Sequence, residues 1–349
     1  MKSASSHRRR RAAARSATRG MTMNKYVALC LSSTLLATAL SAPAGAADGK
    51  YPARPVTIVV PFGAGGIADA LPRIVGQELN SKWGVPVIIE NKVGASGNIG
   101  MDYVARANPD GYTLALAPAG NLTVNPLLYT KLPFDTARDF APVTMLATSP
   151  NVLVVNARVP AKTFTELVAY ARQHPDKLNY SSPGPGSGAH LAGELLNQSA
   201  GIVTRHIPYN AMAAAVNDVV AGNVDMMFAG VSTVLPHIQS GKLRALAVAG
   251  PQRLPQLKDV PTVAESGYPG FDVTSWYGIV APAKVPPDIL DQLQADIAAV
   301  LQKESVRQKF AGLGVDPAGS NRADFGQAIK QETDKWAAIV KQAGIQPIQ

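Results

Sequence analysis

Three glycines lie between a strand-like segment and a helix-like segment near the start of the chain. Residues 56–60 are apolar and mostly β-branched, which predicts a buried strand, and the amphipathic pattern around Leu71 predicts a helix. Between them, Gly63, Gly65 and Gly66 leave backbone N–H groups unshielded, beside the partial positive charge of a helix start. This arrangement is typical of a site that binds a nucleotide, a phosphate or a carboxylate.

The same unit occurs twice in the chain. In the first copy Asp69 is the predicted N-cap of the helix, so that Pro72 falls in the first turn, where its missing N–H costs little. In the second copy a strand at 178–182 leads through a glycine- and proline-rich loop at 183–188 into a helix at 189–200. Two such units predict two similar lobes whose helix starts meet at one cleft, with a small anion between them.

Three patterns in the sequence could indicate an enzyme or a metal site. Residues 63–68 fit the dinucleotide fingerprint with Glu90 as the ribose-binding acid, but the 27-residue spacing from Gly63 exceeds the usual 20 or so. Ser187 lacks the two flanking glycines of a nucleophile elbow. His190 and Glu194 are four residues apart on a predicted helix, yet no third metal ligand is evident nearby. We therefore expect a protein that is not an enzyme, with no catalytic residue, metal or cofactor; a dinucleotide-dependent oxidoreductase is the alternative.

The amino terminus indicates export. Residues 1–46 hold 8 of the 33 basic residues and none of the 24 acidic ones. A basic residue, an apolar stretch at 26–40 and the sequence Ala44-Gly45-Ala46 predict a cleaved secretory signal, with twin-arginine export as an alternative. Cleavage there leaves 25 basic and 24 acidic side chains and removes Cys30, the only cysteine. We expect a periplasmic protein without disulfides and without a nucleic-acid partner.

Strand and helix patterns alternate along the rest of the chain, which predicts parallel sheets covered by helices. Thr163 and Glu166 form a capping box at the start of one helix, and long amphipathic helices are expected at 288–312 and 322–344. The predicted strands, besides those at 56–60 and 178–182, are 85–89, 113–117, 152–155, 203–207, 224–228 and 243–249.

Several longer motifs resemble those of one family when they are taken together. They are Tyr51-Pro-x-Arg-Pro55, Pro61-Phe-Gly-Ala-Gly-Gly-Ile-Ala-Asp69, Glu90-Asn-Lys-x-Gly-Ala-Ser-Gly-Asn98, Asn108-Pro-Asp-Gly-Tyr-Thr113, Lys177-Leu-Asn-Tyr-Ser-Ser-Pro-Gly184, His190-Leu-Ala-Gly-Glu194, Asp259-Val-Pro-Thr-Val-Ala-Glu265 and Trp276-Tyr-Gly-x-x-Ala-Pro282. The mature chain resembles, over nearly its whole length, the extracytoplasmic receptors of tripartite tricarboxylate transporters, the Bordetella-uptake-gene family.

The resemblance implies an α/β fold of the type II periplasmic-binding-protein kind, with a ligand cleft between two lobes. Residues 1–46 are then the cleaved signal, 47–150 the first lobe, 151–270 the second, and 271–349 a hinge strand and a return to the first lobe. It also implies capture of a small organic acid (a carboxylate), without chemistry, for delivery to two integral-membrane transporter subunits. A carboxylate sensor for a periplasmic regulatory partner is the alternative, and we expect a monomer.

The family binds its carboxylate largely through backbone N–H groups and bridging waters. Where the family has Tyr-Lys-Gly-x-x-Pro, this chain reads Tyr209-Asn-Ala-Met-Ala-Ala214, so the ligand's identity does not follow from the resemblance. Carried over by position, the implied ligand-binding residues are Ala64, Gly65, Gly66, Asp69, Ala119, Gly120, Asn121, Ser182, Pro183, Gly184, Gly186, Ser187, His190 and Asp225. Tyr209 is a further candidate, which either closes over the ligand or packs in the fold.

Overall fold

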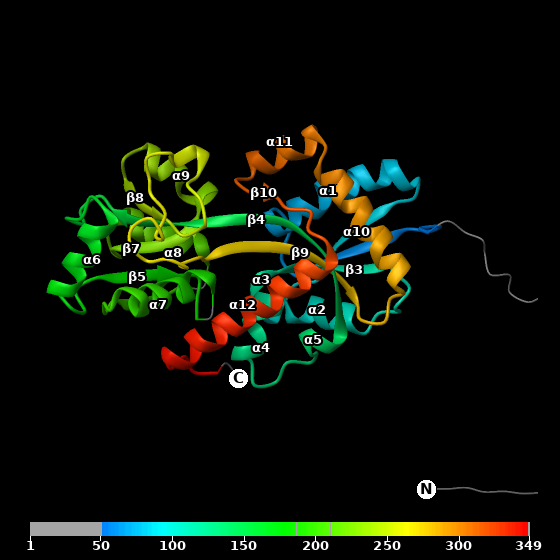
Figure 1. Ribbon diagram of the computed structural model, residues 1–349, viewed down its shortest axis with the longest axis horizontal. Coiled ribbons are helices and arrows are strands. Elements are labelled where there is room, and N and C mark those ends of the chain that lie inside the picture. Colours follow the sequence, from blue (N-terminus) through cyan, green and yellow to red (C-terminus); the bar gives the residue numbers. More distant parts are fainter. Residues whose placement is uncertain (1–50, 186, 210, 348–349) are drawn as a thin grey trace, which may run out of the picture. The chain divides into compact units, whose positions relative to one another are not determined.

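The computed structural model describes residues 51–347, apart from 186 and 210 (Figure 1); the predicted signal segment 1–46 lies outside them. The strands are β1 (Val56–Val60), β2 (Val87–Asn91), β3 (Thr113–Pro118), β4 (Phe140–Asn156), β5 (Asn179–Ser182), β6 (Arg205–Pro208), β7 (Met226–Gly230), β8 (Leu243–Val248), β9 (Thr274–Pro282) and β10 (Asp316–Pro317). The helices are α1 (Ile67–Trp83), α2 (Asn98–Ala105), α3 (Ala119–Thr123), α4 (Asn125–Leu128), α5 (Thr136–Asp139), α6 (Phe164–Gln173), α7 (Gly188–Ala200), α8 (Met212–Ala221), α9 (Val231–Gln239), α10 (Pro287–Leu301), α11 (Glu304–Gly312) and α12 (Arg322–Gln342).

The strands form one mixed sheet in the order β2-β1-β3-β9-β4-β7-β5-β6, with β8 and β10 also paired to β4. Parallel pairing joins β1 to β2 and β3, and joins β5 to β6 and β7. The two long strands β4 and β9 are antiparallel to each other and to their other neighbours. The expected parallel pairing therefore holds within each of the two groups, whereas the long strands β4 and β9 that connect them pair antiparallel.

We call β1–β3 with α1, α2, α10 and α11 the β1 side, and β5–β8 with α6–α9 the β5 side. Strand β4 pairs with β9 through residues 140–150 and then with β7 and β8 through residues 151–156, so one strand serves both sides. Figure 1 shows β4 and β9 running lengthwise between the two groups of helices. Because the parallel strands of each side end at one edge, the loops that follow β1 and β3 are neighbours, as are those that follow β5, β6 and β7.

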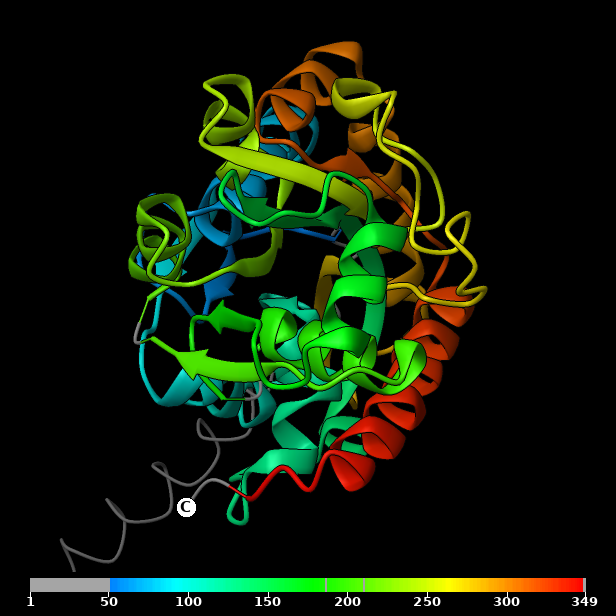
Figure 2. The same cartoon turned by 90° about the vertical axis from the view of Figure 1, so that its left-hand side faces the viewer.

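Separate apolar cores hold the two sides. Val56, Leu71 and Ile297 belong to a core that joins β1, α1 and α10, whereas Leu191 and Phe228 belong to a core around α6, α7 and β7. Helix α12 contacts β4, α3 and α7, and its Trp336 lies in the second of these cores. Figure 2, turned by 90°, shows α12 in red beside the green helices of the β5 side.

The structure confirms the predicted capping box, but it divides one of the predicted long helices. The Thr163 hydroxyl accepts the Glu166 N–H at 3.1 Å, as the capping box predicts. The helical pattern at 288–312 is two helices, α10 and α11, with a break at residues 302 and 303. In the part of the chain that the structure describes, none of the helices combines the length and the apolar character needed to cross a bilayer.

Candidate functional site

The first glycine loop is exposed and leads directly into α1. Gly66 is the N-cap, with extended backbone angles (φ −88°, ψ 175°), and Gly65 adopts the left-handed region at φ +93°. Asp69 is therefore not the N-cap, as the sequence predicted, but the third residue of the helix. Pro72 lies beyond the first turn, inside α1, which corrects the second expectation. Both errors arise because the helix begins at a glycine that has no capping side chain.

Asp69 holds this loop through a hydrogen bond to its backbone. Its buried carboxylate accepts hydrogen bonds from Gly65 N at 3.0 Å, from Arg73 Nε at 3.0 Å and Arg73 Nη2 at 2.8 Å, and from Asn91 Nδ2 at 2.9 Å. The hydrogen bond from Arg73 is the main reason that the pKa of Asp69 lies well below its ordinary value. The carboxylate is thus charged, and its charge is compensated by Arg73 rather than facing an incoming anion. The spacing of Asp69 and Arg73, four residues apart on a helix, was the sequence signal for this pair, and it was missed.

The hydrogen bonds determine which amides remain for a ligand. Gly65 N–H is already donated to Asp69, so it is not the anion donor that its position suggested. The first bonded amides of α1 are those of Asp69 and Ala70, both of which donate to Gly66 O. The amides of Gly66, Ile67 and Ala68 precede them, at the positive end of a 17-residue helix. These three amides are suited to hold a carboxylate.

The second glycine loop follows β5. Gly184 adopts φ +127°, and its carbonyl oxygen accepts the Ser187 hydroxyl at 2.7 Å and Ser187 N–H at 3.2 Å. Ser187 is the N-cap of α7, where its hydroxyl accepts the His190 N–H at 3.3 Å. Pro183 lies between these residues and β5, and Gly186 lies outside the described residues. The loop and helix start were placed correctly from the sequence.

The third predicted segment, after β3, is the short helix α3. Asn121 is buried, and its amide nitrogen donates to Ser96 O at 2.8 Å, so this side chain holds the neighbouring turn. Ala119 and Gly120 line a cavity of about 130 Å³ together with Gly188 from the start of α7. The remaining walls of this cavity come from β9, α7 and α12. The structure therefore brings the loop after β3 and the start of α7 to one cavity.

Tyr209 lies beside the second glycine loop, whereas Asp225 lies far from it. Tyr209 follows β6 next to the second glycine loop; its N–H donates to Ser182 O at 2.9 Å and its hydroxyl to Asp218 at 2.5 Å. Asp225 precedes β7, and its carboxylate accepts the N–H of Asn179 at the start of β5. Because β5 and β7 are parallel, Asp225 lies at the opposite edge of the sheet from the loop after β5. Its assignment to the ligand cleft is therefore corrected.

His190 is buried and forms part of a stack of rings. Its ring lies 4.0 Å from that of His206, which in turn lies 5.0 Å from that of Tyr180. Burial lowers the pKa of both histidines to about 4. His206 lies on β6 within this stack, although the sequence pattern around it suggests a surface or loop residue.

A serine and a histidine meet here without forming a catalytic pair. His206 Nε2 is 2.7 Å from Ser182 Oγ, but Ser182 has no exposed surface that a substrate could reach. Among the residues that the structure describes, no group of three or more His, Cys, Asp or Glu residues could hold a metal ion.

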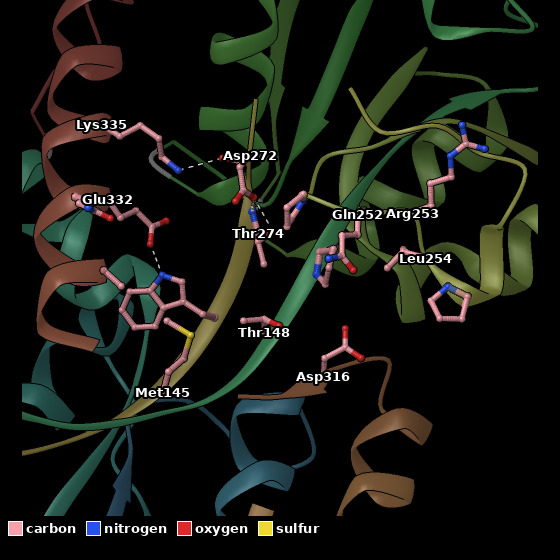
Figure 3. Close-up of a pocket in the computed structure, with 16 residues that line it drawn as sticks. Met145, Thr148, Gln252, Arg253, Leu254, Asp272, Thr274, Asp316, Glu332 and Lys335 are labelled. Carbon is pink, nitrogen blue, oxygen red and sulfur yellow. Dashed lines mark hydrogen bonds between the residues drawn. The ribbon is translucent and has the colours of Figure 1, made fainter. Parts of the chain in front are cut away.

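A larger cavity, of about 700 Å³, contains none of the predicted site residues (Figure 3). Its walls come from β4, β9, the loop after β8, and α12. Most of its polar groups are already bonded: Glu332 accepts the indole N–H groups of Trp276 and Trp336, and Lys335 donates to Asp272 O at 3.0 Å. The candidate site predicted from the sequence is at the glycine loops, where the amides of Gly66, Ile67 and Ala68 precede the first bonded amides of α1.

Comparison with known proteins identifies the family of the chain. Residues 71–345 match the model of the tripartite tricarboxylate transporter family receptor. The chain is 35% identical to the protein BugT of Bordetella pertussis over 323 residues, which are 92% of this chain and 99% of BugT. A structure described as R. palustris Rpa4515 with adipate superposes with a TM-score of 0.75 at 35% identity, covering 86% of this chain and all of that one. MatC from Rhodopseudomonas palustris with bound malate gives 0.69 at 32%, covering 83% of this chain and all of MatC.

These matches cover most of the chain, and they agree with an α/β fold of two parallel groups joined by crossing strands. They leave no place for the oxidoreductase alternative, because the family consists of non-enzymatic solute-binding proteins. The chain belongs to the tripartite tricarboxylate transporter receptor family and is a periplasmic-type solute-binding protein.

Proposed function

We propose that this receptor binds a small carboxylate, of the class of adipate or malate, with one carboxyl group on the amides of Gly66, Ile67 and Ala68. The observation that carries the proposal is the set of amides ahead of the first bonded amide of α1. The buried carboxylate of Asp69 is paired with Arg73, which compensates its negative charge next to the proposed ligand position. Dicarboxylates recorded with the two relatives support the ligand class.

The second glycine loop supplies the opposing wall. The lobes that we propose are residues 47–150 and 151–270, with 271–349 returning to the first across β9. Closure about β4 and β9 brings the starts of α1 and α7 toward the same ligand, which adds contacts that only the closed state makes. Ala64, Pro183 and Gly186 in the two loops, with Tyr209 beside the second, stay in the proposed site.

We further propose that residues 1–46 direct export and are removed, and that the periplasmic monomer delivers its ligand to two integral-membrane transporter subunits. Amino-terminal sequencing of the exported protein tests the first part, and Ala47 is the expected first residue. A retained arginine-rich segment contradicts it.

Calorimetric titration tests the binding site. Adipate and malate are titrated into the wild-type protein and into Gly66→Val and Gly188→Val, after a thermal-shift screen of organic acids. We expect Gly66→Val to lower affinity by about 2 kcal/mol, roughly 30-fold, because the added side chain blocks access to donors of a charged group. Its stability should be retained, because the backbone angles at Gly66 suit any residue and no atom lies within 4 Å of an added Cβ.

The acid must be recovered unchanged after binding. Unaltered affinity of correctly folded Gly66→Val moves the anion away from the first glycine loop. Stabilisation by a dinucleotide alone, or turnover of the acid, contradicts the proposed function.

A further inference from the structure

A buried cluster of polar groups supports the second glycine loop from behind. Ser182, the last residue of β5, is fully buried, and its Oγ lies 2.7 Å from His206 Nε2 on the adjacent strand β6. The same Oγ accepts Gly184 N–H at 3.1 Å. One hydroxyl therefore connects the histidine to the glycine whose φ of +127° turns the chain toward α7.

The position of the Ser182 hydroxyl proton follows from the other hydrogen bonds that Gly184 O accepts. This carbonyl oxygen already accepts the hydroxyl and the N–H of Ser187, at 2.7 and 3.2 Å. The Ser182 hydroxyl lies 3.1 Å from it, farther than from His206 Nε2. The Ser182 proton is therefore better donated to Nε2, and Ser182 Oγ is left to accept from Gly184. A neutral His206 ring is required for this arrangement.

The surroundings keep His206 neutral. Its ring stacks between Tyr180 and His190, at centroid distances of 5.0 and 4.0 Å. Glu194, the nearest acid on α7, accepts the Tyr180 hydroxyl at 2.5 Å and lies 3.9 Å from His190 Nε2. Burial lowers the pKa of His206 to about 4, and the neighbouring His190 lowers it further than Glu194 raises it.

We propose that His206 is a positioning residue for ligand binding, which acts through the Ser182 hydroxyl to fix Gly184 and the start of α7 in the binding conformation. The inference rests on the proposed function, since it assigns the second loop a pre-formed shape for the ligand. Its physical basis is pre-organisation: a loop that is already ordered loses less conformational freedom when the ligand binds. Loss of one ordinary hydrogen bond corresponds to roughly tenfold in affinity.

The test uses His206→Phe, which keeps a ring, and His206→Gln, whose amide oxygen accepts the Ser182 proton without titrating. Ser182→Ala and the double variant His206→Phe/Ser182→Ala complete a cycle. His174→Phe, at an exposed histidine that follows α6, is the matched control. With adipate as the probe, we expect about tenfold weaker binding for His206→Phe and Ser182→Ala, and near wild-type binding for His206→Gln. The double variant should bind no more weakly than Ser182→Ala alone, because both changes break one connection.

Hydrogen exchange of the ligand-free protein gives a readout that is independent of the ligand. The peptide covering residues 183–190 should exchange faster in His206→Phe and Ser182→Ala, but not in His206→Gln or His174→Phe. The positioning role is overturned if the affinity losses of His206→Phe and Ser182→Ala multiply in the double variant. It is also overturned if the peptide covering residues 183–190 exchanges at the wild-type rate in His206→Phe. Either result leaves the proposed function intact. If no organic acid binds the wild-type protein, both the proposed function and this inference fail. If His206→Phe does not fold, Ser182→Ala and His206→Gln test the positioning role through adipate affinity and hydrogen exchange of residues 183–190.

Discussion

The two glycines at the start of α1 should respond in opposite ways to alanine. Gly65 has φ +93° and Gly66 has φ −88°, and neither has an atom within 4 Å of an added Cβ. The two substitutions therefore differ in backbone strain and not in packing. This makes Gly66→Ala the matched control for Gly65→Ala.

The expected difference can be estimated from the backbone angles. An alanine forced into the left-handed region costs about 1–2 kcal/mol, whereas replacing glycine at a compatible position stabilises by about 0.5 kcal/mol through the unfolded chain. If the loop relaxes to relieve the strain, Gly65 N–H moves away from the Asp69 carboxylate, and a charge-assisted hydrogen bond worth about 1.5 kcal/mol weakens instead. Either route places Gly65→Ala about 2 kcal/mol below Gly66→Ala in free energy of unfolding.

Urea denaturation followed by circular dichroism measures this difference, and adipate titration of the same variants adds the effect on binding. Both variants should have the same slope against urea, because neither changes the area exposed on unfolding. Free energies of unfolding that agree within about 0.5 kcal/mol would refute the assigned loop conformation.

Three further outcomes follow from the described contacts. Asp69→Ala should lower the free energy of unfolding by about 2 kcal/mol, since it leaves Gly65 N–H without its charged acceptor. A free energy of unfolding equal to that of the wild type on urea denaturation would contradict this. Burial lowers the pKa of His190 from 6.5 to about 4, so the unfolded chain binds the extra proton first and stability should fall from pH 6.5 to pH 4, by up to about 3 kcal/mol. His190→Phe should flatten that part of a melting-temperature profile, and an unchanged profile would argue against a buried neutral ring. Glu332→Ala should destabilise by about 2 kcal/mol, because the Trp276 indole N–H loses its acceptor in a partly buried place, whereas Glu332→Gln should cost less on urea denaturation.

The strands that follow simple apolar patterns were predictable from the sequence. The run at 56–60 coincides with β1 because it is short, β-branched and bounded by Pro61. In contrast, only residues 152–155 of the 17-residue strand β4 were predicted. Pro142 and Pro150 lie inside β4, and proline within a pattern normally indicates that a strand is interrupted. Their places in the pairing with β9 depend on tertiary structure and not on local propensity.

The same distinction applies to the site. The two glycine loops and the start of α7 were predictable from the glycine clusters that follow strands, whereas α1 begins at Ile67, before the predicted cap. The role of Asp69 was not predictable, since a carboxylate at that position serves equally as a cap or as an acceptor of loop amides. Asp225 was misplaced although the predicted strand at 224–228 already put it near the strand start. In parallel strands that start lies at the edge opposite the loops that follow the strands.

A crystal structure of the protein grown with adipate tests the central claim most directly. The account predicts one carboxylate within hydrogen-bonding distance of the amides of Gly66, Ile67 and Ala68, and the start of α7 across the ligand. Adipate in the cavity between α12 and the loop after β8, with those three amides unoccupied, would contradict it.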